Sequence, residues 1–139
     1  MTLKPLVLAG VLLATLSGCI PAPHRVPLVP ALSGVVTRAG QPVAGAGIVA
    51  SYGLAERHEV DFGVTDAQGR FAGPGKQELH MVRTIGDPVF DWQLRIRAPG
   101  GEVSGYSQRG MGTPPARAEL DCDLDRAVGS VCDLRSSTP

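Results

Sequence analysis

The feature that most constrains the fold of this 139-residue chain is its regular interruption by glycine and proline. From Ala31 onward these residues recur about every eight to twelve positions, and the runs between them have β-type composition. Such spacing is typical of an all-β sandwich or barrel, and the same region has no window with the period and length of an amphipathic helix. We expect strands at residues 32–38, 47–52, 60–65, 70–71, 79–85, 89–98, 102–108 and 120–124.

Strict alternation in residues 89–98 gives the clearest prediction of a strand. Apolar and polar residues follow one another there with a period of two, as expected of a strand buried on one face. The apolar positions of this run are Trp92, Leu94, Ile96 and Ala98. Residues 120–125 alternate in the same way.

The first nineteen residues resemble the signal peptide of a bacterial lipoprotein. Residues 6–16 form an uncharged apolar run of eleven residues, which is too short to span a bilayer and has the length of a signal-peptide core. The run ends in the tetrapeptide LSGC at residues 16–19, which resembles a lipobox. The resemblance implies cleavage before Cys19, with a diacylglycerol on its thiol and an acylated amine. An ordinary secretory signal or a buried apolar helix is the alternative.

This resemblance divides the chain into a signal peptide at 1–18, a lipidated tether at 19–30 and a domain at 31–139. The four prolines of the tether favour polyproline II, and the segment would hold the domain about 30 Å from the membrane. An edge strand at 26–29 is the alternative. Ile20 follows the cysteine in place of the aspartate that retains enteric lipoproteins in the inner membrane. We therefore expect anchoring in a Gram-negative outer membrane, on the periplasmic face.

Charge gives no support for nucleic-acid binding. The chain has 13 Lys and Arg residues against 13 Asp and Glu residues, and it has no basic stripe. We expect no nucleic-acid partner.

The remaining cysteines, Cys122 and Cys132, suit a disulfide in an oxidising compartment. Such a bridge would contribute about 2.5–3 kcal/mol in the chain-entropy treatment of a short loop. Two free thiols or a metal pair are the alternatives, although the cysteines have no Cys-x-x-Cys spacing and no nearby histidine cluster.

Two motifs resemble the carboxypeptidase regulatory-like domain family. Residues 32–48 (LSGVVTRAGQPVAGAGI) are similar to the opening of these domains, and residues 64–71 (VTDAQGRF) are similar to a later turn. The resemblance implies a transthyretin-like sandwich of about seven strands, a module that usually serves as a spacer, stabiliser or binding domain. It covers about forty residues and ends at Phe71.

Two enzyme families that share the transthyretin-like fold resemble this sequence less closely. The chain ends in RSSTP at 135–139, without the Tyr-Arg-Gly-Ser tail of hydroxyisourate hydrolases. Tyr52, Tyr106, His58 and His80 give the residue types of a ferric dioxygenase site, but not its spacing.

Asp121, Asp123 and Asp125 could supply oxygens to calcium, since alternate positions of a strand share a face. A solvated acidic face, paired with Arg95 and Arg97 on a neighbouring strand, is the interpretation that we favour. We expect no metal and no cofactor.

Two loops are candidate partner contacts. One contains Arg57 and His58, and the other begins near Met111. No catalytic spacing surrounds the histidines, so we expect a non-enzymatic envelope lipoprotein that acts as a protein-binding or structural module. A type VI secretion lipoprotein and an immunity protein to a secreted effector are two examples of that class. A small-ligand-binding protein or a hydrolase is the alternative of a different class.

Overall fold

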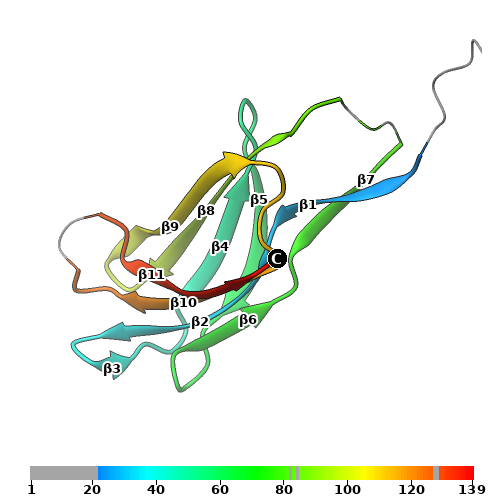
Figure 1. The fold of residues 1–139 in the computed structure, drawn as a ribbon. Coiled ribbons are helices and arrows are strands. Elements are labelled where there is room, and N and C mark those ends of the chain that lie inside the picture. The colour runs from blue at the N-terminus through cyan, green and yellow to red at the C-terminus, as the bar shows by residue number, and fades with distance from the viewer. Residues whose placement is uncertain (1–21, 82, 84, 127–128) are drawn as a thin grey trace, which may run out of the picture.

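The structure is a computed structural model that describes residues 22–81, 83, 85–126 and 129–139. The regular elements of these residues are all β-strands, which confirms the predicted all-β sandwich (Figure 1). The strands are β1 (His24–Val29), β2 (Ala31–Arg38), β3 (Gln41–Pro42), β4 (Gly47–Tyr52), β5 (His58–Val64), β6 (Arg70–Gly73), β7 (Lys76–His80), β8 (Val89–Ala98), β9 (Gly101–Met111), β10 (Arg117–Asp123) and β11 (Cys132–Thr138).

The described chain has eleven strands where about seven were expected. The number rises because Pro30 separates β1 from β2, and because Pro74 and Gly75 separate β6 from β7. The short β3 and the C-terminal β11 add two more.

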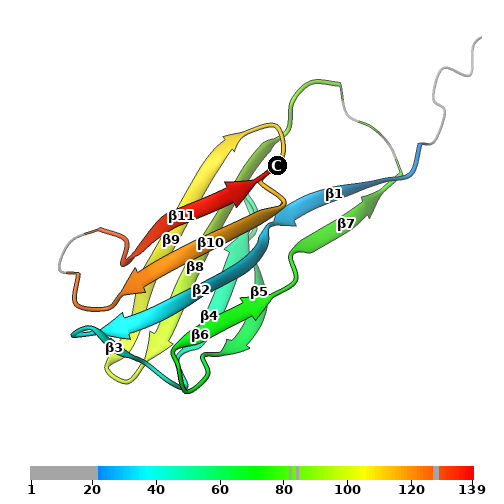
Figure 2. The ribbon, with the colours of Figure 1, turned by 60° about the horizontal axis from the view of Figure 1, so that its bottom comes forward.

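Two sheets pack on each other with the core between them (Figure 2). One sheet has the order β11-β10-β2-β3, with β6 also paired to β2, and the other has the order β5-β4-β8-β9. β10 runs parallel to β2, whereas the other paired strands of the described chain are antiparallel.

The alternating face of β8 forms the centre of the core, as the sequence predicts. Trp92, Leu94 and Ile96 are fully buried, and the Trp92 indole Nε1 donates a hydrogen bond to Gln108 Oε1 at 3.2 Å. The Trp92 ring also packs on Tyr106, with 5.4 Å between the ring centroids. The buried side chains that face them from the other sheet are Leu32, Val36, Phe71, Ala118, Leu120 and Cys122.

A third, two-stranded unit projects from this sandwich. β1 and β7 pair with each other and continue the β2–β6 pair beyond its proline bends (Figures 1 and 2). We call this unit the ribbon. Its inner end belongs to the body, since Val29 is 1 % exposed, and its outer end carries His24 opposite His80.

The ribbon corrects two local predictions. Residues 24–29 were expected to be part of a polyproline II tether, but they form an edge strand, which was the alternative for 26–29. Proline is tolerated there because an edge strand leaves one side of its backbone unpaired. A strand at 79–85 was also expected, but β7 ends at His80, and Met81, Arg83 and Ile85 follow it in a loop.

Cys122 and Cys132 form the predicted disulfide. The two cysteines lie directly opposite each other in the β10–β11 register, and both are about 1 % exposed. The bridge therefore ties β11, which is otherwise exposed along its length, to the core.

Replacing both cysteines with alanine should lower the free energy of unfolding by about 2–5 kcal/mol. Urea unfolding followed by the fluorescence of Trp92, the single tryptophan, measures this change. Alkylation of both thiols without a reductant in the wild-type protein would contradict the pairing.

Gly34 shows how closely β2 approaches its neighbours. A Cβ atom at this position would lie 2.3 Å from the Leu120 carbonyl oxygen and 2.8 Å from the Phe71 ring. Only glycine fits there without moving backbone atoms of the sheet.

Gly34→Ala should therefore destabilise the protein by about 1–3 kcal/mol in the same unfolding measurement. Gly47→Ala is the matched control, because a Cβ atom there meets its nearest neighbour at 3.4 Å. It should leave stability unchanged or raise it by up to about 1 kcal/mol. Equal stability of the two variants would refute the close packing at Gly34.

Candidate functional site

Exposed apolar side chains collect at the end of the sandwich from which the ribbon projects. The strand register joins β4, β5, β8 and β9 at this end, because Tyr52 lies opposite both His58 and Trp92, and Val89 lies opposite Met111. We call it the ribbon end. The large apolar side chains exposed on the ribbon and at the ribbon end are Leu54, Leu79, Met81, Ile85, Val89 and Met111.

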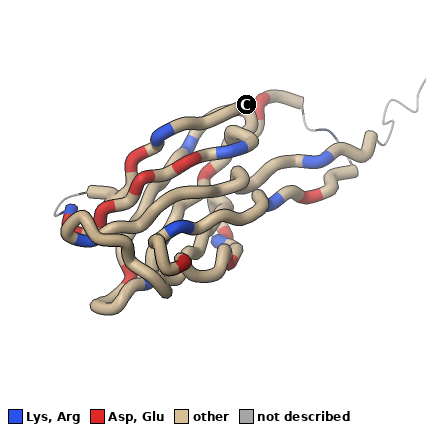
Figure 3. Tube along the Cα trace, turned by 90° about the horizontal axis from the view of Figure 1, so that it is seen from below, with Lys and Arg blue, Asp and Glu red and all other residues tan. Residues whose placement is uncertain are grey.

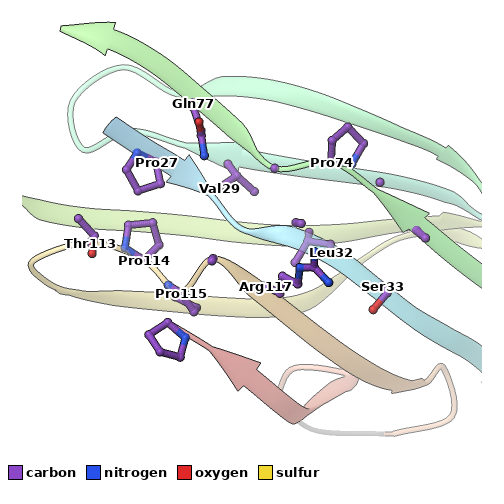
Figure 4. Close-up of a pocket in the computed structure, with 16 residues that line it drawn as sticks. Pro27, Val29, Leu32, Ser33, Pro74, Gln77, Thr113, Pro114, Pro115 and Arg117 are labelled. Atoms are coloured by element: carbon purple, nitrogen blue, oxygen red, sulfur yellow. The ribbon is translucent and has the colours of Figure 1, made fainter. Parts of the chain in front are cut away.

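A groove of about 820 Å³ opens where the ribbon leaves the body (Figure 4). It exists because β10 follows β2 only as far as the Arg117–Ala31 pair, where Ala31 N donates to Ala116 O at 2.9 Å. Beyond this point β1 continues outward, while residues 113–116 diverge from it.

The walls of the groove are rich in proline and mix apolar with polar groups. Pro27 and Val29 lie on β1, and Pro114 and Pro115 lie across from them on the diverging segment (Figure 4). Ser33, Gln77, Thr113 and Arg117 also line the groove. The prolines add no backbone hydrogen-bond donors, because proline has no backbone N–H. Such a surface can contact a segment of another chain through both apolar and polar groups.

The opposite face of the ribbon turns toward the four-stranded sheet. The Tyr52 hydroxyl donates to Glu78 Oε1 at 3.3 Å, and His80 Nε2 lies 3.8 Å from Glu78 Oε2. Burial raises the pKa of the Tyr52 phenol, and the Glu78 carboxylate raises it further. The phenol therefore stays protonated, and able to donate, through neutral pH.

This contact encloses a smaller apolar hollow of about 260 Å³, lined by Leu28, Tyr52, Leu54, Val89 and Phe90 among others. His80 also lines the hollow, and the other two described histidines lie near its lining residues. The rings of His24 and His80 lie 6.1 Å apart, and that of His58 lies 5.4 Å from Tyr52.

The structure brings the three predicted partner-binding residues to the ribbon end. Arg57 forms an ion pair with Asp91 at 2.8 Å, and His58 lies beside Tyr52. Met111 ends β9 and is 74 % exposed. The sequence placed these residues in separate loops, whereas the β4–β5 and β8–β9 pairings place them at one end of the same sheet.

The three aspartates do not share one strand face. β10 ends at Asp123, and Asp125 lies in the following turn, where it accepts a hydrogen bond from Ala39 N. Asp121 lies 3.7 Å from Arg135 on β11, and Asp123 accepts from Asp125 N at 3.0 Å. No group of three His, Cys, Asp or Glu residues in the described parts of the chain is placed to hold a metal ion.

The expected pairing of these aspartates with Arg95 and Arg97 is wrong, because β8 lies in the other sheet. Arg95 and Arg97 instead form ion pairs with Glu59 and Glu102. Each arginine lies 2.7 Å from a carboxylate oxygen of Glu102. The hydrogen bond from Arg97 lowers the pKa of Glu102. Acidic and basic residues are thus interspersed along the described chain (Figure 3).

The groove residues were not predicted as a site. The signal available in the sequence was proline at 27, 74, 114, 115 and 139, in segments that the sequence does not show to be neighbours.

The chain matches the protein family described as a domain of unknown function (DUF6795) over residues 32–127. It belongs to that family. The matched region runs from β2 to just beyond β10, so the outer strands β1 and β11 lie outside it. No curated protein and no solved structure matches the chain. The likeness to carboxypeptidase regulatory-like domains stays a prediction.

Cys19 and the expected signal peptide at 1–18 lie outside the described residues. Within those residues, no helix has the length and apolar character needed to cross a membrane.

Proposed function

We propose that this protein is a lipid-anchored envelope module that binds another protein through the groove at the base of the ribbon. The anchor is Cys19 in the outer membrane, and the sandwich lies on the periplasmic side. The role is non-enzymatic, and the sandwich supports the binding surface.

The groove of Figure 4 is the observation that carries this proposal. Its volume of about 820 Å³ and its proline-rich walls, which mix apolar and polar groups, suit a segment of another chain. Met111 lies two residues before Thr113 of the groove, and the hydrogen bond from Gly112 N to Pro88 O at 2.7 Å holds this part of the chain beside the start of β8.

The short distance in sequence between the proposed anchor and the ribbon also supports the proposal. Cys19 lies five residues before β1, so the ribbon is the first element of the described chain after the proposed lipid site. The groove at its inner end then lies beyond the ribbon, where a periplasmic protein can reach it.

A photo-reactive amino acid placed at Gln77 or Thr113 should form one discrete adduct with a partner protein in living cells. Both residues line the groove. Gln68, which is exposed in the turn between β5 and β6, is the matched control and should give no such adduct. Adducts are resolved by size and identified by mass spectrometry.

The proposal predicts that Pro115→Glu or Val29→Glu weakens the adduct. Pro115→Glu is the better test, because Pro115 is only half-buried, whereas Val29 is buried and its replacement also reduces stability. Absence of an adduct at both groove positions, or the same adducts at Gln68, would contradict binding through the groove.

A further inference from the structure

We propose that the tip of the ribbon rests on the lipid surface to which the chain is anchored. The tip consists of Arg25 and Leu79 at the outer end of the ribbon and of Met81, Arg83 and Ile85 in the loop that follows. This inference rests on the proposed anchor at Cys19.

The tip exposes large apolar side chains in a short stretch of chain. Leu79 is 64 % exposed, Met81 is 54 % exposed, and Ile85 is 106 % exposed. None of the three belongs to the buried core. Their exposure to water is unfavourable, and it is relieved where an apolar phase is adjacent.

The length of chain before the ribbon places a bilayer at the tip. Five residue steps separate Cys19 from His24, and even a fully extended chain covers that distance in at most about 17 Å. A lipid on Cys19 therefore keeps His24, and His80 opposite it, close to the membrane surface.

Because the ribbon projects from the sandwich, its tip can reach the lipid surface while the sandwich stays away from it. β1 has six residues and spans roughly 20 Å, and the ribbon projects from the sandwich along this length (Figures 1 and 2). The tip can thus contact lipid while the groove at the other end of the ribbon stays open.

The two faces of the ribbon differ in polarity near the tip: one carries polar side chains toward the sheet, and the other carries an exposed apolar side chain. Glu78 and His80 face the sheet, where Glu78 accepts the hydrogen bond from Tyr52. Leu79 alternates with them and lies on the other face, opposite Arg25.

The charges near the apolar side chains also suit a lipid headgroup region. Arg25 and Arg83 are exposed at the tip, and cationic side chains next to apolar ones are favourable at an anionic lipid surface. Asp87 is the exposed acidic residue of the same loop, and it lies further along the chain toward β8.

The test places an environment-sensitive fluorophore at the tip of the full-length lipidated protein. Ile85→Cys supplies the only free thiol, because Cys19 is acylated and Cys122 is bonded to Cys132. Val64→Cys is the matched control, since Val64 is 66 % exposed at the end of β5 remote from His58. Both proteins are reconstituted in vesicles of phosphatidylethanolamine and phosphatidylglycerol, with and without lipid-borne quenchers.

We expect a blue-shifted emission and strong quenching at position 85, and water-like emission at position 64. Adding Leu79→Ser and Met81→Ser should reduce the shift at position 85. Vesicle-bound protein whose label at position 85 stays in water, or quenching of equal strength at both positions, would overturn the ribbon contact and leave the anchor intact. Failure of the protein to bind vesicles would refute the anchor, and the ribbon contact with it.

Discussion

The parallel pairing of β2 with β10 is the interaction on which the rest of the structure depends. It joins residues 31–37 to residues 117–123 in seven consecutive register pairs, and it brings strands more than eighty residues apart into one sheet. β10 then holds β11 through antiparallel pairing and the disulfide. Because the parallel ladder stops at Ala31, it also leaves β1 free to continue outward with β7. The groove and the ribbon are both consequences of where this ladder ends.

The sequence predicted the strands whose side chains divide between core and solvent. The range 89–98 has the predicted bounds, because burial of one face imposes the period of two that makes β8 recognisable. The range 47–52 also has the predicted bounds, although β4 is buried on both faces. β11 was not predicted, because beyond Cys132 its residues are exposed and mostly polar. The ribbon was predicted with the wrong bounds. Its apolar residues suggested a strand at 79–85, yet β7 ends at His80, and Leu79 and Met81 are exposed.

Individual residues of the candidate site could be predicted from the sequence, but their arrangement in space could not. Arg57, His58 and Met111 were predicted in loops, whereas His58 begins β5 and Met111 ends β9. Their meeting at one end follows from the pairing of β4 with β5 and of β8 with β9. The groove depends on the β2–β10 register, which joins segments distant in sequence, and no local pattern encodes such a register. Asp121 and Asp123 were correctly placed on one strand, whereas their arginine partner was wrong, because sheet membership cannot be read from alternation.

In the proposed arrangement the lipid, the ribbon, the groove and the sandwich follow one another outward from the membrane, and this order depends on the anchor. Intact-mass analysis of the protein in purified membranes, with sequencing of its N-terminal peptide, tests the anchor most directly. We predict a chain that begins at Cys19 and carries three acyl chains, a modification that makes membrane attachment effectively stable. A mature chain that begins elsewhere, or an unmodified Cys19, would contradict it.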